Sequence, residues 1–160
     1  MDTHALLTPA NVSTSLAARD KAGLLRELAL RAASSLSLSG DRIFSQIMKR
    51  EDLGTTGVGD GVAIPHVRLA EVEQPVGFLA RLDDPINFDA VDGRPVDLVF
   101  LLLLPGAPTG GQLAALASVA RALRDPERVA RARAAADAQG VYLAMTSTPS
   151  AGQQPANQPE

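Results

Sequence analysis

The sequence contains no cysteine and no tryptophan, and only two of its 160 residues are histidines. Disulfides and thiolate metal sites are therefore excluded, and His4 and His66 lie too far apart in the chain to form a His-rich zinc site, so we expect no metal. Lysine and arginine are scattered along a chain whose net charge is −3. No basic block is present that could neutralise a run of phosphates, so nucleic acid is not an expected partner.

Long apolar segments are also missing. The first twelve residues, MDTHALLTPANV, lack the basic region and apolar core of a secretory signal. The longest apolar run, Val96–Pro105, contains Asp97 and is far shorter than the roughly 20 residues that a membrane helix needs. We therefore expect a cytoplasmic protein without direct membrane insertion.

What the chain does have is enough apolar sequence, 46% of its residues, to bury the core of one domain. We expect this domain over residues 1–146. From Ser147 onward no aliphatic residue is larger than alanine. Such a segment buries too little surface to offset its ordering entropy, so residues 147–160 are predicted to be a disordered tail.

Helical periodicity marks four segments. Leucines and alanines from Lys21 to about Leu38 form one stripe that Gly40 would end, and Asp41 would cap a second helix ending near Arg50. Two further helices are predicted over residues 112–125 and 126–138, the second opened by Pro126. Near the N-terminus, Thr8 and Pro9 suggest a helix start, followed by a short strand over 13–16.

Strand patterns fall between these helices. Residues 62–67 predict a short strand whose Pro65 places it at an edge or ends it near His66, whereas residues 53–61, with four glycines and two threonines, predict a loop. Residues 76–83 and 96–104 predict longer strands, the second apolar on both faces and therefore central. The expected fold is a single α/β domain with a mixed β-sheet flanked by helices on both faces.

His66 is the residue that most needs an explanation. It follows Pro65 directly and comes after a segment rich in glycine and threonine. One interpretation is a hydrogen-bonded cap of a strand end, which is the usual role of a single histidine. The other is a reactive group, favoured by the polar approach, by the nearby Arg50 and Arg68, and by the stiff backbone at Pro65.

The reactive interpretation has a definite chemistry. A neutral imidazole has one ring nitrogen with a free lone pair, which can attack phosphorus without a separate base. The phosphoryl group adds close to two negative charges, and these need N–H donors or a guanidinium nearby. The Gly-Thr loop and Arg50 fit those roles, although an arginine at a helix end can equally be a solvated charge.

These residues carry a family resemblance. The stretch KREDLGTTGVGDGVAIPHVRL (49–69), followed by VGFLARLDDPINFDAVDGRPVDLVFLLLLP (76–105), resembles the enzyme IIA domain of the phosphoenolpyruvate-dependent phosphotransferase system, in its fructose/mannitol type. Within that type it is most similar to the nitrogen-regulatory branch. The likeness covers Leu6 to Met145, and its most specific part is small-x-x-apolar-Ala-apolar-Pro-His, here Gly59 to His66.

The resemblance implies a phosphoryl relay without a cofactor. His66 would take the phosphoryl group, on Nε2, from a carrier protein of the HPr type. Arg50 would help to hold it, and Thr55 and Thr56 would be the loop's Ser/Thr pair. Sugar-transporting members pass the group to an enzyme IIB, whereas nitrogen-branch members regulate partner proteins through their phosphorylation state. The oligomeric state is left open.

Two positions depart from the family pattern. Val67 stands where a glycine is common, and its branched side chain narrows the permitted backbone angles, so a reshaped site rim is expected. Gln112 stands where many members have a second histidine. Its amide could donate to a phosphate or hold the His66 tautomer, but it cannot titrate, and it can equally be a solvent-facing residue at a helix start.

Other candidate motifs carry less. Asp83 with Asp84, and Asp89 with Asp92, could be paired carboxylates, but they stand among proline, asparagine and glycine, where aspartate mostly builds turns. The segment GVGDG precedes a strand instead of following one, which excludes a dinucleotide loop. Three functions remain: a regulatory phosphoryl-relay protein, a sugar-specific IIA subunit, and a binding module of the same fold without phosphoryl transfer.

Overall fold

Strand β6 (Val96–Pro105) lies at the centre of the fold, and nearly all of its side chains are buried. Successive side chains of a strand point to opposite faces of the sheet, so this one apolar run supplies both cores. Val99, Leu101 and Leu103 belong to one buried cluster, and Leu98, Phe100 and Leu102 belong to the other. The computed structural model describes residues 3–107 and 111–147.

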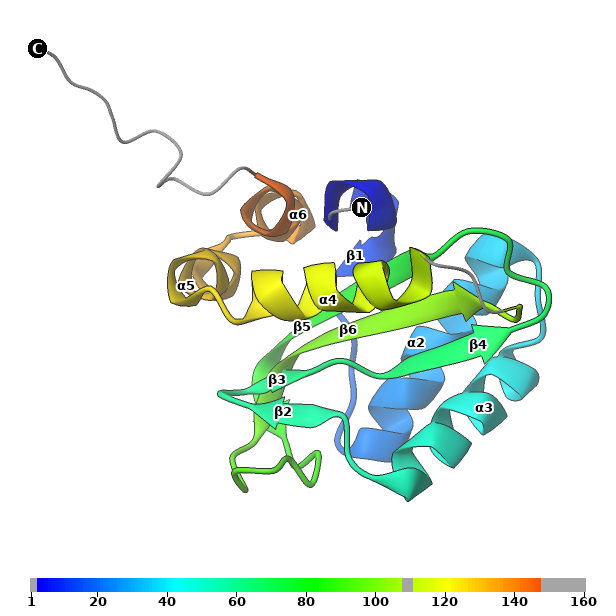
Figure 1. The fold of residues 1–160 in the computed structure, drawn as a ribbon. Coiled ribbons are helices and arrows are strands. Elements are labelled where there is room, and N and C mark those ends of the chain that lie inside the picture. The colour runs from blue at the N-terminus through cyan, green and yellow to red at the C-terminus, as the bar shows by residue number, and fades with distance from the viewer. Residues whose placement is uncertain (1–2, 108–110, 148–160) are drawn as a thin grey trace, which may run out of the picture.

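The described residues form a mixed, six-stranded sheet in the order β1-β5-β6-β3-β2, with β4 also paired to β6 (Figure 1). Strand β5 (Val76–Ile86) runs antiparallel to β6, and β1 (Val12–Ser13) pairs in parallel with β5. Strands β3 (Val62–Ala63) and β4 (His66–Leu69) both run parallel to β6, one after the other along the same side. The prediction of a central strand is confirmed.

Two helices cover one face of the sheet. Helix α2 (Lys21–Leu36) begins at the cap Asp20, which accepts from the Gly23 N–H, and α3 (Gly40–Leu53) follows it closely. Gly40 does not end α2, as the sequence had suggested; Ser37, in the left-handed conformation at φ 57°, ends it. Asp41 is not the cap of α3 either, because the Ser39 hydroxyl accepts from the Arg42 N–H.

The remaining helices cover the opposite face. The prediction of one helix over residues 126–138 is wrong: α5 ends at Ala134, and Asp137 caps a new helix that the periodicity did not reveal. The helical segments of this layer are α1 (Thr3–Leu6), the 3-10 turn η1 (Pro9–Asn11), α4 (Gly111–Leu123), α5 (Pro126–Ala134) and α6 (Ala138–Thr146).

The glycine-rich segment 53–61 is only partly a loop. Strand β2 (Gly57–Gly59) forms a hairpin with β3, and the two turn residues, Asp60 and Gly61, have φ of 57° and 80°. Both values are positive, as a tight Asp-Gly hairpin turn requires. The strand expected over 62–67 is interrupted at Ile64 and Pro65, so β4 starts at His66 itself.

Single-domain α/β architecture with helices on both faces of the sheet is confirmed (Figure 1). The short strand expected over 13–16 lies at Val12–Ser13 instead. Among the described residues, no helix is both long and apolar enough to cross a membrane. The tail predicted over 147–160 lies, apart from Ser147, outside the described residues.

Candidate functional site

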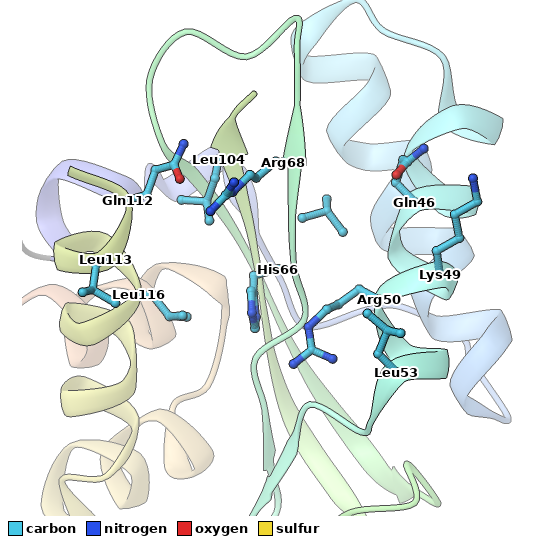
Figure 2. Close-up of a pocket in the computed structure, with 11 residues that line it drawn as sticks. Gln46, Lys49, Arg50, Leu53, His66, Arg68, Leu104, Gln112, Leu113 and Leu116 are labelled. Carbon is cyan, nitrogen blue, oxygen red and sulfur yellow. The ribbon is translucent and has the colours of Figure 1, made fainter. Parts of the chain in front are cut away.

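His66 begins β4 with its ring held by its own main chain. The ring Nδ1 lies 2.8 Å from the carbonyl oxygen of Ile64. A carbonyl oxygen can only accept, so Nδ1 carries the ring proton and Nε2 keeps the lone pair. The ring is partly exposed and borders a cavity, so the nitrogen with the free lone pair is the one that an incoming group can reach (Figure 2).

The Ile64 carbonyl is available because Ile64 turns its main chain away from β6, and its N–H donates to the Thr56 carbonyl at 2.9 Å. Proline has no N–H to donate to a sheet ladder, so β3 and β4 are separate strands. The chain stays aligned with β6 nonetheless, because the Pro65 carbonyl accepts from the Leu102 N–H at 2.9 Å. Ile64 lies between the two strands, and its carbonyl oxygen turns to the His66 ring.

The cavity beside His66 has a volume of about 690 Å³. Helix α3, strands β4 and β6, and helix α4 contribute its walls (Figure 2). Three lining residues, Lys49, Arg50 and Arg68, are cationic, and no lining residue among those described is a carboxylate. Opposite charge is favourable in such a site, so the cavity suits an anion.

Arg50 reaches this cavity from the end of α3. One of its nitrogens, Nη1, donates to the carbonyl oxygen of Gly54 at 2.8 Å. Figure 2 shows its guanidinium turned toward the His66 ring. The fork has five N–H donors, so it can hold the Gly54 carbonyl and still offer donors to a second group. The structure thus brings together the two residues that the sequence had singled out first.

Thr55 and Thr56 are placed differently from that pair. Neither lines the cavity as far as the structure describes the chain. The Thr55 hydroxyl donates to the Phe88 carbonyl at 3.1 Å and accepts from the Gly57 N–H at 3.0 Å. Thr56 is buried, and both its N–H and its hydroxyl donate to the Glu51 carboxylate. Their hydroxyls hold the loop, and their predicted contact with a phosphoryl group stays a prediction.

Comparison with known proteins identifies the family. The family model for the phosphoenolpyruvate-dependent sugar phosphotransferase system, EIIA 2, matches residues 5–147. This chain belongs to that family. A "Nitrogen regulatory protein" from Bradyrhizobium diazoefficiens is 44% identical over 144 residues, which is 90% of this chain and 94% of the relative. The Escherichia coli protein of the same name is 43% identical over 118 residues, 73% of this chain and 72% of that protein.

Solved structures of similar fold include a nitrogen regulatory protein as well. The crystal structure of nitrogen regulatory protein IIA-Ntr from Neisseria meningitidis has a TM-score of 0.84 and 34% identity, and the match covers 90% of this chain and 99% of that one. A complex of enzyme IIAMTL and phosphorylated enzyme IIBMTL from Escherichia coli has a TM-score of 0.73 at 15% identity, covering 89% and 100%. At that identity the likeness concerns the fold alone.

In this EIIA 2 chain, Val67 is accommodated without strain. Its side chain is buried in the core beneath α2 and α3, and its backbone pairs with Leu103 in the sheet. Its φ is not among the positive values found in the described chain. Extended backbone suits a β-branched residue, so no glycine is needed at this position. His66 and Arg68, the neighbours of Val67 in β4, face away from that core. All three residues line the cavity.

Gln112 is buried, so the alternative of a solvent-facing residue at the start of α4 is wrong. It lines the cavity, and its Nε2 donates to the carbonyl oxygens of Pro105 and Ala107 at 2.7 and 2.8 Å. Both amide hydrogens therefore have acceptors in the chain itself. A donation from Gln112 to a bound phosphoryl group, which the chemistry of its amide allows, requires one of these bonds to open.

Sequence reasoning missed other residues of this EIIA 2 site. Lys49 and the exposed Leu53 and Leu113 line the cavity. Glu51 is buried without lining the cavity, and one signal for its burial was available: Glu51 follows Ile43 and Ile47 at the four-residue spacing of the buried face of α3. Within the described ranges, no cluster of three or more His, Asp or Glu residues could hold a metal ion.

Proposed function

We propose that this protein is a histidine phosphoryl-relay protein of the nitrogen-regulatory type. His66 accepts a phosphoryl group from an HPr-like carrier protein, and the phosphorylation state then regulates partner proteins. The observation that carries the proposal is the His66 ring, with Nδ1 bound to the Ile64 carbonyl and Nε2 free beside three cations. The nitrogen-regulatory relatives, matched over most of their length, support the regulatory output.

The transfer is an in-line exchange between two imidazoles. The Nε2 lone pair of His66 attacks the phosphorus of the carrier's phosphohistidine, forming one N–P bond while the carrier's N–P bond breaks. A carrier ring protonated on its other nitrogen leaves as neutral imidazole. The phosphorylated His66 ring now carries the positive charge. Its proton stays on Nδ1, which donates it in a hydrogen bond to the Ile64 carbonyl. No proton has to cross the interface.

Charge stabilisation is the protein's main contribution to this step. Phosphoryl transfer spreads negative charge over three oxygens, and catalysis consists largely of positioning and electrostatics. Arg50 is the group we assign to the transferring oxygens, because its fork faces His66 while Gly54 fixes its other side. Lys49 and Arg68 add positive charge at the cavity wall.

The docking face for the carrier has an apolar component. Leu53 on α3 and Leu113 on α4 are 86% and 77% exposed, and both line the cavity. Figure 2 shows them on opposite sides of His66. Exposed leucines around a reactive group are typical of a transient protein interface, where they exclude water from the transfer.

The test is direct. The protein is incubated with the phosphorylated upstream carrier, and acid-labile, base-stable phosphate is measured on the wild type and on His66→Ala. We expect label on the wild type alone, with the phosphorus on Nε2 by NMR. Label that persists in His66→Ala contradicts the assignment, and a wild type that takes no label favours the binding module. Onward transfer to a sugar-specific IIB would favour the sugar-uptake alternative.

A further inference from the structure

Glu51 is a buried carboxylate directly next to Arg50 in the sequence. Its side chain is only 2% exposed, although it belongs to the last turns of α3, close to the loop that leads to β2. A carboxylate out of water is costly unless it is paired and hydrogen-bonded. The groups that pair with the Glu51 carboxylate therefore affect how Arg50 is positioned.

Three groups satisfy Glu51. The Thr56 N–H donates to Oε1 at 3.1 Å, and the Thr56 hydroxyl donates to Oε2. Lys21, the first residue of α2, places its Nζ 2.9 Å from Oε1. The carboxylate thus ties the start of α2 to the loop that follows α3, two segments that the sequence separates by 30 residues or more.

The same loop holds Arg50. The Gly54 N–H donates to the Glu51 carbonyl at 3.1 Å, and the Gly54 carbonyl accepts from Arg50 Nη1 at 2.8 Å. Fixing Thr56 on the Glu51 carboxylate closes this loop back onto α3. A guanidinium that is bonded to a fixed carbonyl has fewer rotamers to lose when it meets a ligand.

Lys21 also makes a second contact. Its ammonium, which balances the charge of the Glu51 carboxylate, lies 4.7 Å from the centroid of the Phe88 ring. Consecutive residues of a helix do not face each other, so the carboxylate is directed to Lys21 and not to Arg50. Phe88 in turn supplies the carbonyl that accepts from Thr55. The contacts of Lys21 and Phe88 thus both lead to the loop of residues 54–56.

We propose that Lys21 and Glu51 are positioning residues for phosphoryl transfer: the ion pair of Lys21 with the buried Glu51 carboxylate locks residues 54–56 and thereby directs the Arg50 guanidinium at His66. The proposal rests on the proposed function of His66. Neither residue touches the phosphoryl group, and both act through the placement of Arg50.

The experiment measures the rate of phosphoryl acceptance from the phosphorylated carrier in Glu51→Gln, which keeps the shape of the side chain, and in Lys21→Met. We expect each rate to fall about tenfold, since small misplacements of a catalytic group cost one to two orders of magnitude. Lys21→Arg, which restores the cation, should recover most of the rate. Thermal unfolding and circular dichroism establish that each variant is folded at the assay temperature.

A matched control lies on the same two helices. Arg26 on α2 and Asp41 on α3 form an ion pair at 3.6 Å that is exposed and away from the loop. Arg26→Met removes a cation from the same α2–α3 packing without touching the loop. Its transfer rate should stay within about twofold of the wild type, as expected for a surface pair.

A double-mutant cycle separates positioning from general stability. In an Arg50→Gln background, Glu51→Gln and Lys21→Met should slow transfer by less than about twofold, because the residue through which they act is gone. An undiminished tenfold effect in that background, or no effect in the wild-type background, overturns the proposal. If wild type itself takes no phosphate, or His66→Ala keeps its label, then it is the proposed function that has failed.

Discussion

His66 takes its tautomer from the chain two residues before it. The Ile64 carbonyl at 2.8 Å fixes the proton on Nδ1, and no carboxylate takes part in that contact. Orientation by a carbonyl adds no negative charge near a phosphoryl dianion. Local geometry leaves the lone pair on Nε2, which is the nitrogen that we propose as the phosphoryl acceptor.

Arg68 offers the cleanest single-residue test of the cationic cavity. Its side chain is exposed on β4, so Arg68→Glu should change the free energy of unfolding by no more than about 0.5 kcal/mol. It should slow acceptance from the phosphorylated carrier roughly tenfold at low ionic strength and less as salt is added, because screening weakens steering.

Arg31→Glu on α2 is the control, since it makes the same change in net charge at an exposed residue that does not line the cavity. Stopped-flow rates across a salt series compare the two variants. Equal slowing of both would mean that net charge, and not the cavity, governs the encounter.

At the scale of elements, the start of α3 shows how a sequence can offer two plausible caps. Ser39 and Asp41 are both good capping residues, and the sequence alone favoured Asp41, which comes directly after Gly40. In the structure Gly40 is already helical, so the cap is Ser39, and Asp41 lies in the first turn.

Ser39→Ala should therefore cost about 1 kcal/mol of unfolding free energy, because it removes the acceptor of the Arg42 N–H. Asp41→Ala should cost at most about 0.5 kcal/mol, since its ion pair with Arg26 is exposed. Urea unfolding of both variants gives the ranking. The reverse order would restore Asp41 as the cap.

The β2–β3 hairpin provides a pH-dependent contact. Backbone N–H groups of Asp60 and Arg94 donate to the Asp92 carboxylate at 2.9 and 3.0 Å, and they hold the pKa of Asp92 below its ordinary value of 3.8. A lowered pKa in the folded state means that Asp92 contributes stability above about pH 4. That contribution is lost as the pH falls through the lower, folded-state value.

Asp92→Asn should consequently lower the melting temperature by a constant amount between pH 5 and 7, and the difference from wild type should shrink below about pH 4. Calorimetry of both proteins across this range measures the effect. A difference that grows toward acid pH would mean that folding raises the pKa of Asp92.

Over the whole molecule, β6 supplies side chains to both cores, and β5 beside it does the same with Ala80 on one face and Leu79 on the other. Gly77 on β5 lies where the two strands pack tightly: a Cβ at this position would come within 2.4 Å of the Phe100 ring, which is fully buried. The ring cannot move aside without disturbing the core under α4, so space, not backbone conformation, requires glycine here.

We expect Gly77→Ala to destabilise the protein by about 1–3 kcal/mol through overpacking. Gly40→Ala is the control, because its Cβ would meet mainly the half-exposed Leu30 side chain, which can move. Denaturant unfolding compares the two. A neutral Gly77→Ala would show that the Phe100 ring has room to shift.

Sequence patterns predicted what local periodicity and chemistry determine. The helix from Lys21, the long strands and the choice of His66 and Arg50, which line one cavity, all come from short-range signals. The hairpin at Asp60-Gly61 was missed because its glycines also indicate a loop, and α6 was missed because the alanines before Asp137 continue a helical pattern.

Contacts between distant segments were out of reach for a different reason. Lys21 and Glu51 stand on different helices, and only the packing of α2 against α3 brings their side chains together. The two amide hydrogens of Gln112 likewise find acceptors that no spacing rule identifies. Residues that position a site can therefore be identified only from the fold, whereas candidate reactive residues can be identified from the sequence.

The cavity beside His66 takes its walls from α3 and α4, helices that cover opposite faces of the sheet. A protein that binds over His66 therefore contacts both helical layers, one on each face of the sheet. Amide hydrogens of β4, whose ladder partner is β6 alone among the described strands, should then exchange with solvent more slowly in the bound protein.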